Sequence, residues 1–296
     1  MNNEIDIYNN LKTAGKIHKT VMEEGLKLIK VGEKLYDVAE YVENRTKELG
    51  GEVAFPCNIS INSIAAHYSP YFGDNSVFSE NDVVKLDIGV HVNGYIADGA
   101  KTVDLSNSYS DLIKASEDAL YTVINNIEAP MNVGEMGKII NEVIVSYGYK
   151  PISNLSGHVM EQYYLHSGTC IPNVYENTKQ TIDVGDIVAI EPFATNGFGQ
   201  VIDGKEKYIF KYLTSRPVRL PTARKLLTII EKNYRCLPFS ERWFSNIPKH
   251  NMALRTLMNS GCIYGYPTLI DKKNGIVSQA EHTILITENG VEIITK

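Results

Sequence analysis

The chain has 296 residues, of which 43% are hydrophobic and 22% charged, and this near-average mixture argues against disorder and against a coiled coil. Its net charge of −6 argues against DNA binding, and no apolar run approaches the roughly 20 residues that span a bilayer. Four scattered cysteines, without a CxxC pair or a secretory leader, favour a reducing compartment, so we expect a cytoplasmic globular protein that does not enter a membrane.

Two helices are predicted within the first fifty residues. Apolar residues recur at helical spacing from Ile5 to Val21, and residues 35–49 continue that pattern until Gly50 and Gly51 stop it.

The apolar period changes after residue 52. Residues 81–92 and 95–105 are rich in strand-forming residues and flank Asn93-Gly94, which is a strong signal for a two-residue hairpin turn. The sequence therefore predicts two antiparallel strands here.

The rest of the chain alternates between helical and strand patterns. Residues 109–148 are predicted to be helical and residues 183–194 to form a short, nearly continuous apolar strand. A second hairpin is predicted from 282–287 and 291–296 around Asn289-Gly290.

Residues 205–235 differ in character, because they hold nine Lys or Arg residues against two acids in a chain that is negative overall. This basic stretch leads into helical patterns at 226–234 and 251–259. A helical insert within an α/β core fits the order of these patterns.

Two acids occupy the predicted strands of the first hairpin, although aspartate is depleted in strands. If Asn93-Gly94 form the turn, Asp98 lies opposite Gly89, and Asp87 shares the face of Gly89. The two carboxylates are then diagonal neighbours roughly 7–8 Å apart at the backbone, with space left by Gly89 between them. Such a pair could hold cations, but a pair of edge-strand acids facing solvent stays an open alternative on the hairpin alone.

Further polar residues occur at strand-like sites. Glu191 ends one apolar run and Glu281 begins another, while His158, His166 and His67 follow short stretches of small or polar residues. Each histidine alone is more often structural than a ligand. Four carboxylates and one imidazole together nevertheless suit hard or borderline divalent metals.

These residues, in this order, closely resemble the type II methionine aminopeptidases, and the resemblance covers nearly the whole chain. The absence of a long charged N-terminal extension makes the archaeal members the nearest in kind. One departure is that Val-Met-Glu follows His158, where relatives carry smaller residues, which affects the expected pocket shape and not the ligand. The stretches that carry the resemblance are 14–21, 32–43, 54–70, 83–105, 164–174, 189–195, 237–244, 264–271 and 279–287.

The resemblance implies a two-lobed "pita-bread" α/β fold spanning residues 1–296, with a helical type II insert at about 207–266. It also implies two divalent ions per chain, whose identity (Co, Mn, Fe or Zn) the ligand set leaves open. Asp87 would bind one ion, His158 and Glu191 the other, and Asp98 and Glu281 both.

Residue roles carried over from the family complete the expectation. Glu191 would move protons, and His67 and His166 would contact the substrate. The methionine side chain would lie among Phe55, Asn58, Leu165 and Tyr266, although ordinary core packing stays an alternative for Phe55 and Leu165.

The implied function is removal of the initiator methionine from nascent proteins whose second residue is small. The implied protein is a monomer, with the ribosome as a candidate second partner. Two rivals remain, a proline-specific peptidase of the same fold and a non-catalytic ribosome- or RNA-binding relative. The proline-specific peptidases usually carry a separate N-terminal domain and lack the helical insert. The non-catalytic relatives have lost the metal ligands, whereas this chain keeps all five.

Overall fold

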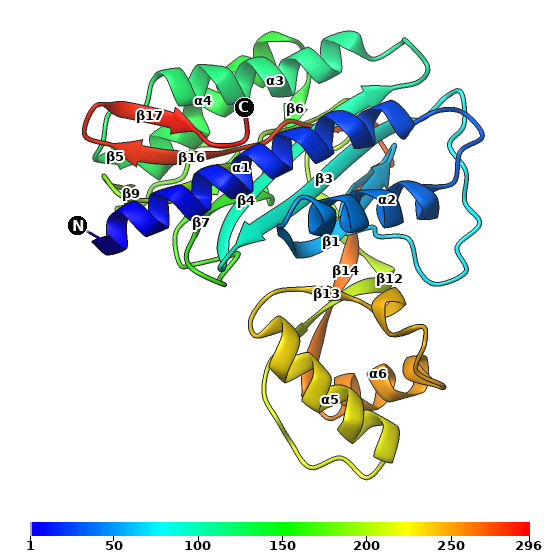
Figure 1. Cartoon of the computed structure of the whole chain (residues 1–296). Coiled ribbons are helices and arrows are strands. Elements are labelled where there is room, and N and C mark those ends of the chain that lie inside the picture. The colour runs from blue at the N-terminus through cyan, green and yellow to red at the C-terminus, as the bar shows by residue number, and fades with distance from the viewer. Residues whose placement is uncertain (1) are drawn as a thin grey trace.

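Two N-terminal helices cover a three-stranded antiparallel sheet in the computed structural model, which describes residues 2–296 (Figure 1). Helix α1 (Asn2–Leu28) packs on β3 (Val83–Val92) and β4 (Tyr95–Asp104), and α2 (Leu35–Glu48) packs on β1 (Glu52–Ile61). Leu11, Val21 and Val38 of the helices belong to one buried apolar cluster with Leu86 of β3. Both predicted helices and the predicted hairpin are confirmed.

A second lobe has its own apolar core beneath α3 (Ser110–Asn125) and α4 (Val133–Ser146), so the helical prediction for 109–148 is confirmed in its main part. The core strands form a five-stranded sheet in the order β17-β16-β10-β7-β8. Their bounds are β7 (Ser156–Met160), β8 (Cys170–Pro172), β10 (Ile187–Ile190), β16 (His282–Thr287) and β17 (Gly290–Ile293). Strands β16 and β17 form the predicted second hairpin.

The single strand predicted over residues 183–194 is wrong, because the chain forms two short strands there. Strand β10 ends at Ile190, and β11 (Phe193–Thr195) begins after Glu191 and Pro192. Proline has no N–H to donate to a ladder, which accounts for the break. Strand β11 joins a different sheet in the order β15-β11-β6, with β15 (Val277–Gln279) and β6 (Lys150–Pro151), so Glu191 lies at a junction between sheets.

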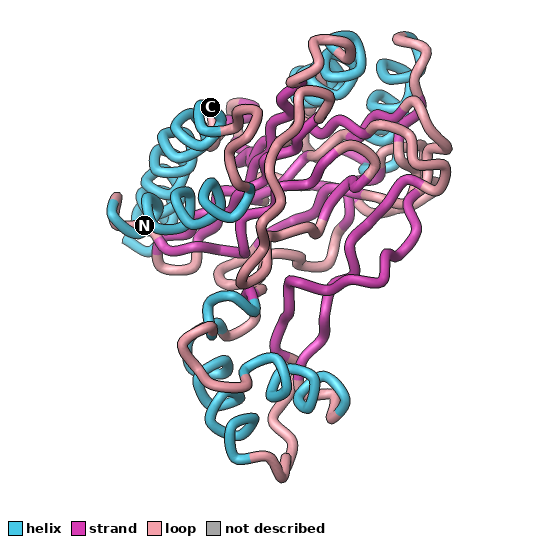
Figure 2. The backbone as a smooth tube through the Cα atoms, turned by 90° about the vertical axis from the view of Figure 1, so that its right-hand side faces the viewer, coloured by secondary structure: helices cyan, strands magenta, loops and turns pink. Residues whose placement is uncertain are grey.

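A helical segment projects from this core on two long antiparallel strands, β12 (Val201–Tyr212) and β14 (Ile263–Asp271) (Figures 1 and 2). Between them lie α5 (Pro221–Tyr234), the 3-10 helix η1 (Glu241–Phe244) and α6 (His250–Asn259). Their apolar faces enclose a separate core that includes Phe210, Leu226, Phe239 and Leu257. The first residues of the basic stretch therefore lie in a strand, and its helical part begins at α5.

Short strands complete the sheets. Strands β13 (Phe239–Ser240) and β2 (Ile64–Ala66) flank the long ribbon in the order β13-β12-β14-β2, and β5 (Met131–Asn132) pairs with β9 (Thr181–Ile182). Because β2 pairs with β14, the ribbon is tied directly to the segment that carries His67.

A buried ion-pair cluster joins the projecting segment to the N-terminal lobe. Arg242 of η1 donates from Nε to Glu40 of α2 (2.9 Å) and from Nη1 to the hydroxyl of Ser69 (2.8 Å). Its Nη2 contacts Glu43, which also accepts a hydrogen bond from the Trp243 indole at 2.6 Å. The arginine side chain has no exposed surface, so these partners replace water around its charge.

Across residues 2–296, no helix is both long enough and apolar enough to cross a membrane.

Candidate active site

One cavity gathers all of the predicted site residues at the meeting point of the two lobes and the β12–β14 ribbon. Its polar lining consists of Asn58, His67, Asp87, Asp98, His158, His166, Glu191 and Glu281. Its remaining lining consists of the predicted Phe55, Leu165 and Tyr266 together with Ala66, Ile209 and Pro238. The structure thus brings these residues together, while their roles stay predictions.

The first hairpin places its two acids as the sequence predicted. Val92 pairs with Tyr95 and Gly89 with Asp98, so Asp87 and Asp98 lie diagonally on one face. The expectation that Gly89 leaves space between the carboxylates is wrong. A β-carbon on Gly89 would lie 2.2 Å from the Phe55 ring, so that ring fills the space.

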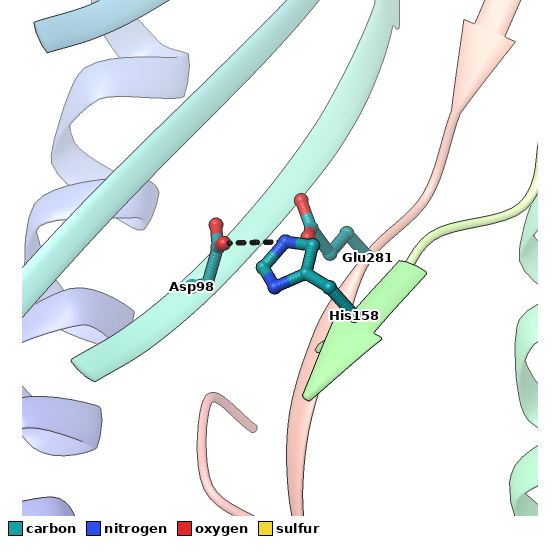
Figure 3. Close-up of side chains that lie close together, drawn as sticks. All are labelled: Asp98, His158 and Glu281. Atoms are coloured by element: carbon teal, nitrogen blue, oxygen red, sulfur yellow. Dashed lines mark ion pairs between the residues drawn. The ribbon is translucent and has the colours of Figure 1, made fainter. Parts of the chain in front are cut away.

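Three adjacent strands of the five-stranded sheet bring in the other polar groups. His158 lies on β7 opposite Ala189 of β10, Glu191 directly follows β10, and Glu281 directly precedes β16. His158 Nε2 lies 3.5 Å from Asp98 Oδ2 and 3.8 Å from Glu191 Oε1. Figure 3 shows Asp98, His158 and Glu281 converging, with one ligand atom from each within 4.8 Å of the others.

Burial and mutual repulsion shift the pKa values of the side chains in this cluster. Burial raises the pKa of Asp87 to about 7. Burial, followed by repulsion from the neighbouring acids, raises the pKa values of Asp98, Glu191 and Glu281 well above their usual range. Burial also lowers the pKa of His158. Buried acids whose pKa values are raised in this way can all ionise near neutral pH only if positive charge lies close by.

The donor set fits divalent metal ions. Among residues 2–296, Asp87 Oδ1 and Asp98 Oδ1 are buried and have no hydrogen-bond partner. Unpartnered buried carboxylate oxygens are costly, and a bound cation would satisfy them. Oxygen ligands with one imidazole nitrogen match hard and borderline ions.

The two remaining histidines lie beside the acids and are neutral near pH 7. His67 has a left-handed backbone (φ 65°), and its Nδ1 lies 3.2 Å from the carbonyl of Pro267. The His166 ring contacts His158 edge-on at 4.4 Å between centroids. Burial lowers the pKa of His67, and burial together with His67 lowers the pKa of His166 to about 4.

Sequence reasoning missed one polar side chain at this site, Gln279. It is buried, and its amide nitrogen lies 3.3 Å from Glu191, 3.4 Å from Glu281 and 3.5 Å from Asp87. A signal was present, since Gln279 precedes Glu281 by two residues and strand residues two apart share a face.

The chain matches the model of the metallopeptidase family M24 over residues 9–288. It belongs to that family. The methionine aminopeptidase of Methanocaldococcus jannaschii is 67% identical over 99% of this chain and 100% of its own length. That of Thermococcus onnurineus is 48% identical over 95% of this chain and 97% of its own length.

Solved structures confirm the pita-bread fold of this M24 metallopeptidase. A thermophilic Arx1 superposes with a TM-score of 0.86 at 19% identity, covering 98% of this chain and 90% of its own. The methionine aminopeptidase of Thermotoga maritima superposes with a TM-score of 0.73 at 23% identity, covering 97% of this chain and 96% of its own. The predicted fold and the resemblance to archaeal methionine aminopeptidases are both confirmed.

Proposed function

We propose that this metallopeptidase is a methionine aminopeptidase that removes the initiator methionine of new proteins whose second residue is small. The observation that carries the proposal is the 67% identity, over nearly the full chain, to a methionine aminopeptidase. The cavity supports it, because acids, histidines and apolar side chains surround one space.

The five predicted ligands would hold two divalent ions, Co, Mn, Fe or Zn. Asp87 would bind one ion, His158 and Glu191 the other, and Asp98 and Glu281 would bridge both. Bound ions would lower the pKa of a water towards neutrality and offset negative charge that develops on the substrate carbonyl oxygen.

Glu191 is the group that we assign to proton transfer. Its side chain is 15% exposed, more than those of Asp98 and His158, so it faces the open part of the cavity. It would accept a proton from the attacking water and deliver it to the amine of the leaving peptide.

His67 and His166 would position the substrate peptide. Because His67 Nδ1 faces the Pro267 carbonyl, Nδ1 carries the proton and Nε2 is left as an acceptor for a substrate N–H. His166 is also neutral and would donate a ring N–H to the substrate carbonyl oxygen, where charge develops.

The apolar lining would select methionine. Phe55, Asn58, Leu165 and Tyr266 line the cavity and would surround a long thioether. A bulky second residue would push the scissile carbonyl away from the catalytic groups, and a displacement of about 1 Å can cost about a hundredfold in rate.

A panel of four peptides with added Mn or Co tests this assignment. We expect fast release of methionine from Met-Ala-Ser and slow release from Met-Leu-Ser. Leu-Ala-Ser should be slower than Met-Ala-Ser by roughly 10–200-fold, because apolar pockets discriminate weakly between similar shapes.

The fourth peptide, Ala-Pro-Ser, separates the rival functions. Preferential cleavage of Ala-Pro-Ser would assign the chain to the proline-specific peptidases. No cleavage of any peptide by protein that is loaded with metal would favour a non-catalytic binding protein.

The segment at about 207–266 is, in our proposal, the type II insert of a single-domain monomer working in the cytoplasm, and its surface could contact ribosomal RNA. Of the nine Lys and Arg side chains in residues 205–235, all but Lys211 are exposed. A local excess of positive charge on an acidic protein favours a polyanionic partner.

Ribosome co-sedimentation across a salt series tests that contact. We expect binding at low salt that falls steeply as salt rises, because such binding releases counterions. Neutralising Lys205, Lys207, Arg216 and Arg219 should abolish it, whereas neutralising the exposed Lys27, Lys114, Lys138 and Lys179 should not. Equal binding by both variants would rule the contact out.

A further inference from the structure

Gln279 approaches the cluster of acids from the protein side. Its side chain is 1% exposed, and the residue does not line the cavity that the acids surround. Its Nε2 nevertheless lies within 3.3–3.5 Å of carboxylate oxygens from Asp87, Glu191 and Glu281. One amide therefore contacts acids from the middle of β3, the end of β10 and the start of β16.

The backbone of Gln279 is fixed on both sides. Its N–H donates to the hydroxyl of Thr102 on β4 (2.9 Å), and that hydroxyl donates back to the Gln279 carbonyl (2.6 Å). On the other side Gln279 pairs with Phe193 of β11. Since the main chain is held to two strands, the position of the amide is set by the surrounding sheet.

The contacts use one oxygen of each acid and leave the other. Gln279 contacts Asp87 Oδ2, while Asp87 Oδ1 is buried without a partner among the described residues. It contacts Glu191 Oε2, while Glu191 Oε1 faces His158 at 3.8 Å. The amide thus contacts one oxygen of each acid and leaves the second oxygen for another partner.

The amide of Gln279 is neutral, which suits a site where carboxylates would balance the charge of metal ions. Four ionised carboxylates carry a charge of −4, which two divalent ions would balance. A lysine or arginine at this position would add a positive charge and compete with the ions, and an acid would add a fifth negative charge. An amide donates hydrogen bonds without changing the charge.

We propose that Gln279 is a positioning residue that holds Asp87, Glu191 and Glu281 through one oxygen each, leaves the second oxygen of each to bind metal, and so sets the affinity for the two ions. This inference rests on the proposed metal centre. Partners that orient metal ligands in this way typically change metal affinity by 10–100-fold when they are removed.

Metal titration of the metal-free full chain tests the inference without any substrate. Gln279→Met keeps the length of the side chain and removes its donors, and Gln279→Asn keeps an amide that is one carbon too short to reach. Calorimetry with Mn should show roughly 10–100-fold weaker binding for both variants. The Asn variant keeps a polar amide in the wrong place, so it tests whether the position of the amide matters as well as its ability to donate hydrogen bonds.

Ser278→Ala is the matched control. Ser278 lies on the same strand and is fully buried, and its hydroxyl donates to the Leu112 carbonyl at 2.7 Å without touching an acid. This variant should lower the melting temperature of the metal-free protein while keeping wild-type affinity for Mn.

The outcomes separate this inference from the proposed function. Wild-type affinity in either Gln279 variant, or an equal loss in Ser278→Ala, would overturn the positioning role. A wild-type chain that binds no ion would overturn it together with the metal centre. A chain that binds two ions but cleaves no Met-Ala peptide would overturn the function and leave the role of Gln279 standing.

Discussion

Glu281→Gln should lower bound metal and the rate of methionine release together. The substitution keeps the shape of the side chain and removes one of four negative charges from a buried cluster, where burial and neighbouring acids raise the pKa of Glu281. We expect a loss in kcat/KM of more than about a hundredfold, beyond the 10–100-fold typical of residues that only orient a ligand. Metal analysis after dialysis and peptide kinetics measure the two quantities.

Glu288→Gln provides the control for Glu281→Gln. It makes the same chemical change at an exposed position just beyond the other end of β16, and metal content and activity should both be kept. Full activity of Glu281→Gln without added metal would show that Glu281 does not bridge two ions.

Arg242→Met should lower the free energy of unfolding by about 3–5 kcal/mol. Removing one partner of a buried ion pair leaves the other charge buried and uncompensated. Here that charge is Glu43, which is 3% exposed, and the loss also frees Ser69 and Glu40. Urea unfolding of the metal-free protein measures the change.

Arg45→Met is the matched control for Arg242→Met. Arg45 pairs with Glu24 and Glu48 at the surface, with 31% of its side chain exposed. Surface pairs typically contribute under about 1 kcal/mol, so this substitution should have a small effect. Equal losses in the two variants would mean that the buried cluster stabilises the fold no more than a surface ion pair does.

Local signals predicted the parts of the fold that depend on neighbouring residues. The register of the first hairpin followed from Asn93-Gly94 alone, because turn length fixes strand pairing. The break at Glu191-Pro192 was missed, since an apolar run hides the point where a chain changes sheets. Nothing local could have shown that Phe55 fills the space at Gly89, because the two strands pair through a bulged register.

The site residues also fall into those that local sequence signals predicted and those that they did not. The hairpin placed Asp87 and Asp98 on one face. His158, Glu191 and Glu281 lie in distant parts of the chain, where their residue types suggested a metal site but only the family resemblance assigned each a place in it. The place of Gln279 two residues before Glu281 was a signal that went unused, but its contacts with Asp87 and Glu191, and those of Arg242 with Glu40 and Glu43, join residues far apart in sequence. Their discovery required the folded chain.

The spread of the acidic cluster along the chain has a consequence for biosynthesis. Asp87 and Asp98 lie in one hairpin, which can close within microseconds, but Glu281 follows Asp98 by 183 residues. At roughly 5–20 residues per second, synthesis needs about 10–40 s to cover that distance. A growing chain therefore lacks Glu281, one of the two proposed bridging ligands, throughout this interval. Completion of the metal site would be deferred until Glu281 has been synthesised and has folded beside the other four ligands.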